Sequence, residues 1–270
     1  MVDAVVFSKN RPAQLDLFLR TFYGSVNSNE IFNLKVIYKA TEKQYQLGYN
    51  LIKRMYPCLV EEEVDLKEQT FAHFDKNHFC FFTDDSFFYR LVDTTNLLNT
   101  LAVLQKNECF SLRLGLNTKD NHGWQCHDLR LTKDFGQEED IIWYNPKEYD
   151  YNSQYGYTMS VDGHIYHHSL IERLKTLNFS NPNQLEGSEL SKLADSITKM
   201  YCFDKSVLVI NPINIVSDLS NNWNGEKYGR TTEELNQNFL KGNFLTFKPF
   251  EPNSTHYEVE LDYVFPVRSR

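Results

Sequence analysis

"FCFFTDDSFF", residues 79–88, sets two adjacent carboxylates, Asp84 and Asp85, at the end of an aromatic run that predicts a buried strand. Two ionised carboxylates about 4 Å apart repel by roughly 4 kcal/mol at an effective dielectric near 20, so an unpartnered pair is unfavourable. Ligands of parallel α/β sheets bind at the carboxyl ends of strands. The pair therefore indicates a site for a divalent cation, with an Asx-type turn or a helix N-cap as the alternative.

The first 115 residues alternate between short apolar runs and helical patterns, which predicts βαβ units and a mostly parallel sheet. Pro12 lies where a helix would begin, and Pro57 where the next helix would end. The expected strands are residues 4–8, 35–40, 58–62, 79–83 and 109–114.

The second half is less regular. Residues 117–146 are polar and glycine-dotted, which indicates an insertion into the core fold. We expect helices over 166–177 and 186–200, a strand over 207–210, and a surface tail from residue 211. No repeat divides the chain, so the economical prediction is one α/β domain with an elaborated C-terminal half.

Composition excludes several classes of protein. The net charge of −8 argues against a large nucleic-acid interface, which needs clustered Lys and Arg. No apolar run approaches the roughly 18 residues of a membrane span, and the N-terminus lacks the basic leader of a signal peptide. The five cysteines are scattered and odd in number, which favours a reducing, cytoplasmic location over a disulfide framework.

The first predicted strand runs into a polar turn and a helix in "VVFSKNRPAQLDLFLRTF", residues 5–22. Lys9 and Arg11 fall where basic side chains and a helix N-terminus could hold a phosphate. The turn has none of the glycines of a dinucleotide fingerprint, and no P-loop pattern occurs in the chain.

The S-K-N-R-P turn followed by T-D-D-S resembles the nucleotide-sugar glycosyltransferases of the GT-A fold, particularly a family-2-like group. "VIYKAT" (36–41) and "QLGYNLIK" (46–53) look like a subgroup seen in bacteria and large viruses. The resemblance covers most of the chain and implies a Rossmann-type α/β/α sandwich. It implies one domain, 1–270, in which 1–115 bind the nucleotide and 116–270 form the donor-sugar and acceptor half.

The resemblance also implies roles for individual residues. The turn after the first strand would line the nucleotide pocket, and T-D-D-S would supply the DxD motif. Asp84 would contact the ribose or uridine, and Asp85 would coordinate Mn²⁺ or Mg²⁺ on the donor diphosphate. The pocket residues of the first turn are Ser8, Lys9, Asn10 and Arg11.

Two further stretches match that subgroup: "DGHI", residues 162–165, and "PNQLE", residues 182–186. Glu186 occupies the place of the family's catalytic base, Asp162 is the alternative base, and His164 is a candidate for contacting substrate. A looser match to a closing loop is "NPINIVSDLSNNWNG", residues 211–225.

Histidine spacing leaves a zinc site as a minor alternative, and the tryptophans could stack on an acceptor sugar or pack in the core. The histidine groups are His164, His167 and His168, and His122 with Cys126 and His127; the tryptophans are Trp124, Trp143 and Trp223.

Taken together, the sequence predicts a metal-dependent hexosyl- or pentosyltransferase of glycan biosynthesis. It would move a sugar from a nucleoside-diphosphate sugar, preferably a UDP-sugar, to a hydroxyl of a glycan or glycoconjugate. A nucleotidyltransferase would also use acidic metal ligands, but should show a glycine-rich first loop. A non-catalytic sugar- or nucleotide-binding module would have no need of the paired aspartates.

Overall fold

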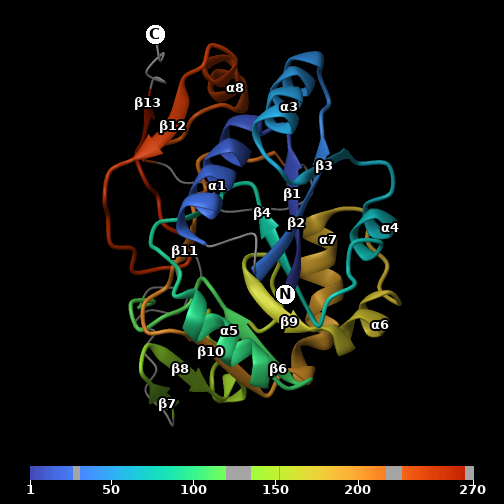
Figure 1. Cartoon of the computed structure of the whole chain (residues 1–270), viewed down its shortest axis with the longest axis vertical. Helices are drawn as coiled ribbons and strands as arrows, with labels where there is room; N and C mark the ends of the chain where they lie inside the picture. The colour runs from blue at the N-terminus through green and yellow to red at the C-terminus, as the bar shows by residue number, and fades with distance from the viewer. Residues whose placement is uncertain (27–30, 120–134, 152, 217–226, 265–270) are drawn as a thin grey trace.

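The computed structural model describes residues 1–26, 31–119, 135–151, 153–216 and 227–264. Strands and helices alternate through the first half, as the apolar pattern predicts, and the elements of the second half are shorter (Figure 1). The strands are β1 (Val2–Lys9), β2 (Phe32–Lys39), β3 (Leu59–Glu62), β4 (His78–Thr83), β5 (Ser86–Phe88), β6 (Glu108–Ser111), β7 (Phe135–Glu138), β8 (Ile141–Tyr144), β9 (His164–His167), β10 (Lys199–Phe203), β11 (Leu208–Ile210), β12 (Phe244–Phe247) and β13 (Leu261–Val264).

Helices connect most of these strands, and several in the second half are single turns. The α-helices are α1 (Pro12–Ser25), α3 (Lys43–Met55), α4 (Leu66–Phe71), α5 (Thr94–Val103), α6 (Ile171–Leu174), α7 (Pro182–Gln184) and α8 (Thr232–Leu240). Leu185–Glu189 form a π-helical turn, and the 3₁₀ segments are Pro146–Glu148, His168–Leu170 and Leu190–Ser196. No helix in the described ranges is long and apolar enough to span a membrane.

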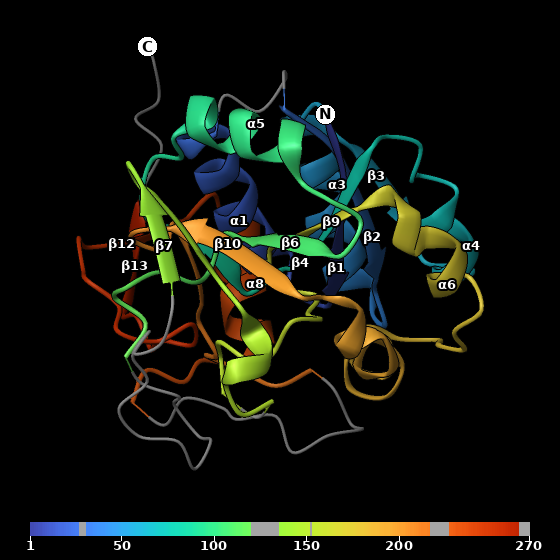
Figure 2. The ribbon, with the colours of Figure 1, turned by 90° about the horizontal axis from the view of Figure 1, so that it is seen from below.

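The central sheet has nine strands in the order β3-β2-β1-β4-β9-β6-β10-β8-β7. Strands β8 and β9 run antiparallel to the other seven strands, so the sheet is mixed but mostly parallel. Figure 2 shows β10 and β6 side by side beyond β9. The carboxyl ends of β1 and β4 are therefore adjacent, and they bring the two stretches singled out in the sequence together.

Successive residues of each buried strand point to opposite faces of the sheet, and each face has its own core. Val6 and Phe82 belong to the core under α1, α3 and α8, whereas Phe7 and Phe81 belong to the core under α4 and α6. Each fully buried phenylalanine contributes about 1.5–3 kcal/mol of hydrophobic stabilisation. Residues 79–82 thus pack against the helices on both faces of the sheet. The expected α/β/α sandwich is confirmed (Figure 1).

Two helix predictions in the second half were wrong in their bounds. Tyr166 and His167 lie in β9, because that segment fills the place between β4 and β6 and pairs with both. The helical turns near Glu186 begin earlier, at Pro182, and end at Ser196 because the following residues join the sheet as β10. Strand pairing therefore outweighs the helical spacing of these apolar residues.

The predicted insertion, residues 117–146, is only in part an excursion. Residues 120–134 lie outside the described ranges, but β7 and β8 extend the central sheet beyond β10. Ile142 and Tyr144 of β8 are buried in the core under α6. Because the segment is mostly polar, its sequence did not predict the β7–β8 hairpin that extends the sheet.

Gly163 has a left-handed backbone, with φ of +75°, and an added Cβ would lie 2.4 Å from Leu208 Cδ2. We expect Gly163→Ala to cost about 1–2 kcal/mol for the backbone and a further 1–3 kcal/mol or so for overpacking. Gly242→Ala is the matched control, because its φ is +84° but nothing lies within 4 Å of the added Cβ. Urea unfolding measures the loss of unfolding free energy in each variant. Equal losses in Gly163→Ala and Gly242→Ala would contradict the close approach of residue 163 to Leu208.

Candidate active site

The turn between β1 and α1 has a fixed shape. Asn10 adopts φ of 56°, and its side chain binds the turn after β2, donating to Thr41 Oγ1 at 2.8 Å and accepting from Thr41 N at 2.9 Å. Pro12 begins α1, where its missing N–H costs nothing. Asn10 therefore acts in the described structure as a brace between two turns, with Arg11 immediately after it.

Asp84 lies at the centre of the site and is buried. Its carboxylate accepts hydrogen bonds from Ser8 Oγ at 2.7 Å, Lys9 N at 3.2 Å and Arg11 Nη1 at 3.0 Å. Burial and the charge of Asp85 outweigh the neighbouring guanidinium and raise the pKa of Asp84 to about 6. Three residues of the predicted first turn thus converge on the first aspartate of T-D-D-S.

Arg11 relieves the repulsion between the two aspartates. Its Nη1 lies 3.0 Å from Asp84 Oδ1 and 2.9 Å from Asp85 Oδ2. Burial works against the guanidinium charge, but the two carboxylates prevail and raise the pKa of Arg11. Asp84 and Asp85 form a turn into β5 and cap no helix, which removes the helix N-cap alternative.

Asp162 joins the same centre through Thr83, the residue before Asp84. Thr83 Oγ1 donates to Asp162 Oδ1 at 2.7 Å, and Arg113 Nη1 lies 3.8 Å from Asp162 Oδ2. Burial, with the charge of Glu186 next in size, raises the pKa of Asp162 to about 7. A carboxyl that titrates near neutrality is suited to accept a proton.

Glu186 lies close to Asp162, on the π-helical turn. Its Oε1 accepts from Ser160 Oγ at 2.8 Å and from Val161 N at 3.3 Å, and Ser160 Oγ in turn accepts from Asp162 N at 3.1 Å. Ser160 therefore links the two candidate bases, because it contacts the carboxylate of Glu186 and the backbone N–H of Asp162.

His164 lies behind this group. Its ring is fully buried, Nδ1 is 3.2 Å from Thr158 O, and Nε2 is 3.3 Å from Arg113 Nε. Burial, assisted by the charge of Arg113, lowers the pKa of His164, so the ring is neutral. Both ring nitrogens have protein partners, which places His164 next to Arg113 rather than at an open surface.

Asp85 is the residue that fits a divalent cation. Its side chain is 18% exposed, and Mg²⁺ commonly takes only one or two carboxylates with waters and substrate phosphates. Within the described ranges, no three His, Cys, Asp or Glu side chains form a group that could hold a metal without a substrate. His167 Nδ1 contacts Ser169 and His168 Nδ1 contacts Lys76 O, so the histidines of that group do not converge on one ligand.

Several other predicted residues lie elsewhere. Trp143 is in β8, beside Lys199 and against Gly136, far along the sheet from β1. His122, Trp124, Cys126, His127 and Trp223 fall outside the described ranges.

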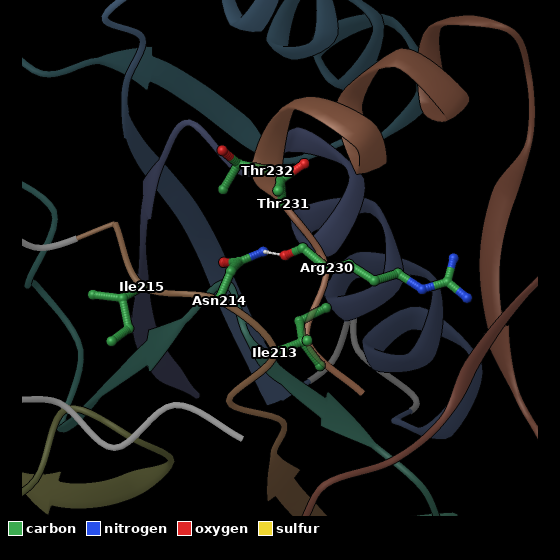
Figure 3. Close-up of a pocket in the computed structure, with 7 residues that line it drawn as sticks. Ile213, Asn214, Ile215, Arg230, Thr231 and Thr232 are labelled. Carbon is green, nitrogen blue, oxygen red and sulfur yellow. Dashed lines mark hydrogen bonds between the residues drawn. The ribbon is translucent and has the colours of Figure 1, made fainter. Parts of the chain in front are cut away.

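A cavity of about 470 Å³ adjoins the site where the chain after β11 passes the start of α8. Figure 3 shows Asn214 between Ile213 and Ile215, opposite Arg230, whose carbonyl accepts from Asn214 Nδ2 at 3.2 Å. Asn214 also holds Arg11, so one residue is shared by the cavity wall and the charged centre.

Two residues of the site, Arg113 and Asn214, were not predicted from the sequence. Arg113 is a lone cation in the apolar stretch "CFSLRLG", residues 109–115, and a charge in such a stretch is a usable signal because it needs a buried partner. Asn214 belongs to the loosely matched loop, but its contact with Arg11 spans 203 residues and no local pattern foretells it.

Solved structures with a related architecture bear on the fold alone. S. aureus TarS, residues 1–349, a GT-A-type glycosyltransferase, matches with a TM-score of 0.51 at 12% identity, over 77% of this chain and 60% of that one. The same fragment with UDP-GlcNAc gives 0.49 at 13% identity, over 77% and 58%, and mouse xyloside xylosyltransferase 1 gives 0.33 at 10%, over 73% and 76%. No family model matches the sequence, and no curated protein does.

The chain therefore has the GT-A fold, and it spans 60% of the length of the TarS fragment.

The raised pKa of Asp162 predicts how stability varies with pH. Because the folded value, about 7, lies above that of an unfolded Asp, this carboxyl stabilises the fold while protonated and loses that contribution as the pH rises through 7. Asp162→Asn keeps an acceptor for Thr83 without the charge. The variant should therefore gain about 1–4 kcal/mol over the native protein between pH 4 and pH 8.

Urea unfolding at several pH values measures this gap. Asp262→Asn, at an exposed ion pair with Lys248, is the control and should show little pH dependence. If the difference in unfolding free energy between Asp162→Asn and the native protein were the same at every pH, the pKa of Asp162 would be the same in the folded and unfolded chains, contrary to this prediction.

Proposed function

We propose that the protein is a metal-dependent glycosyltransferase that uses a nucleoside-diphosphate sugar, with a UDP-sugar as the first donor to test. One observation carries the proposal. Arg11, the Asp84–Asp85 pair and the Asp162–Glu186 pair meet at the carboxyl ends of β1 and β4, in a GT-A fold. A nucleotide site, a cation ligand and a base are thus available at one sheet edge.

The charge of the site supports a role for a metal ion. Four carboxylates, those of Asp84, Asp85, Asp162 and Glu186, are accompanied by two contacting guanidinium groups. Such a centre does not attract a diphosphate on its own. Mn²⁺ or Mg²⁺ at Asp85 would offset the local excess of negative charge and stabilise the charge that develops on the departing diphosphate.

The reaction would be a displacement at the anomeric carbon. The acceptor hydroxyl passes its proton to Glu186 or Asp162, its oxygen bonds to the anomeric carbon, and the bond to the diphosphate breaks. Glu186 is part-exposed and held by two donors, whereas Asp162 is buried with a pKa near 7. We propose that one member of the pair accepts the proton.

The donor sugar would be a hexose or pentose, and the acceptor a hydroxyl of a glycan or glycoconjugate in the cytoplasm. Among the structures with related folds, TarS was determined with UDP-GlcNAc. For this chain, UDP-GlcNAc is therefore a sensible member of the donor panel.

The experiment is a panel of UDP-, GDP- and CMP-sugars with and without Mn²⁺, read by thermal shift and by nucleotide release. We expect stabilisation by UDP or a UDP-sugar that requires Mn²⁺, with slow release of UDP from the matching donor. Binding of a nucleoside triphosphate with release of pyrophosphate would replace this proposal with a nucleotidyltransferase. Sugar binding with no nucleotide dependence would favour a non-catalytic module.

Asp85→Asn tests the cation ligand. It should abolish Mn²⁺-dependent binding of UDP and leave the melting temperature within a few degrees of the native value, because it removes a part-exposed charge and opens no cavity. Asp75→Asn, at an exposed aspartate paired with Lys76, is the control and should bind UDP as the native protein does. Retained Mn²⁺-dependent binding in Asp85→Asn would remove Asp85 from the metal site.

A further inference from the structure

Arg11 is held more completely than a surface arginine would be. Four of its five N–H groups have named partners: Nη1 donates to Asp84 and to Asp85, Nε donates to Asn214 Oδ1 at 2.8 Å, and Nη2 donates to Asn214 O. The side chain is only 8% exposed. The acidic pair therefore already has a cation, and that cation is part of the chain.

A divalent ion at Asp85 would have to compete with this guanidinium. Asp85 Oδ2 lies 2.9 Å from Arg11 Nη1, well within hydrogen-bond distance. Two cations on one carboxylate repel each other, so each lowers the affinity of the site for the other.

We propose that Arg11 is the internal counter-ion that keeps Asp85 from binding a divalent metal until a nucleoside diphosphate arrives. The incoming phosphate oxygens accept the Nη1 hydrogen bond that Asp85 gives up, and Asp85 then turns to the metal. Metal and nucleotide consequently bind together, each raising the affinity for the other by the same factor. This inference rests on the proposed function and adds to it the order of charge exchange within the site.

The rest of the contact set explains why Arg11 can exchange one partner without leaving. Asn214 holds Nε and Nη2, and Asp84 holds Nη1, so the guanidinium plane stays fixed when Asp85 is lost as a partner. Gln14 supports Asn214 from α1, with Nε2 3.4 Å from Asn214 Oδ1. A lysine could not do this, because its single ammonium cannot reach both aspartates and Asn214 in one plane.

The test measures binding of Mn²⁺ by electron paramagnetic resonance and binding of UDP by calorimetry, each with and without the other ligand. The proteins are the full chain, Arg11→Gln, and Arg20→Gln as a matched control. Arg20 lies on α1, the helix that Arg11 precedes, and it pairs with Asp16 instead of the acidic pair.

The native protein should bind Mn²⁺ about tenfold more tightly when UDP is saturating, and UDP should gain the same factor from Mn²⁺. In Arg11→Gln, binding of Mn²⁺ alone should strengthen by about tenfold and the mutual enhancement should fall below that of the native protein, leaving only the part that comes from direct contact between Mn²⁺ and the diphosphate. Arg20→Gln should behave as the native protein does.

Tight binding of Mn²⁺ alone to the native protein, without enhancement by UDP, overturns the inference. This outcome can be seen with the native protein alone. A folded Arg11→Gln protein whose affinity for Mn²⁺ alone is unchanged or weaker also overturns the inference. If no nucleoside diphosphate binds to any of the proteins, with or without metal, the proposed function fails and this inference fails with it. Mutual enhancement of UDP and Mn²⁺ binding that is the same in Arg11→Gln as in the native protein leaves the proposed function standing and rejects the role of Arg11.

Discussion

The arrangement of the site depends on the ion pairs that the Arg11 guanidinium forms with Asp84 and Asp85. Two carboxylates side by side at the end of β4 would repel each other strongly without a positive partner. The chain supplies one from the turn after β1, the neighbouring strand, and anchors it through Asn214 from the far end of the sequence. One residue therefore joins the first strand, the fourth strand and the C-terminal segment.

The two other carboxylates reach the same edge through the unusual placement of β9. This short antiparallel strand lies between β4 and β6, and the Asp162–Gly163 turn that precedes it lies at the ends of both. Gly163 N donates to Phe81 O at 2.8 Å, and Leu112 N donates to Gly163 O at 2.9 Å. Asp162 is thereby placed next to Thr83, and Ser160 carries the connection on to Glu186.

Much of the first half could be predicted from the sequence, because strand and helix signals there are local. The alternation of buried faces in residues 79–82 and the proline at the start of α1 are of this kind. The second half could not, because its elements depend on pairing partners far away: β9 has the spacing of a helix but fills a gap in the sheet. For the same reason Arg11 was expected beside a phosphate, while its ion pairs with both aspartates emerged only from the fold.

In the proposed function, a nucleoside diphosphate and a divalent cation bind together at this charged centre. Anomalous diffraction from crystals grown with UDP and Mn²⁺ would locate the ion. We expect an anomalous peak within bonding distance of a carboxylate oxygen of Asp85 and of a phosphate oxygen of UDP. A nucleotide bound away from the ends of β1 and β4, or Mn²⁺ bound only at other residues, would contradict the proposed function.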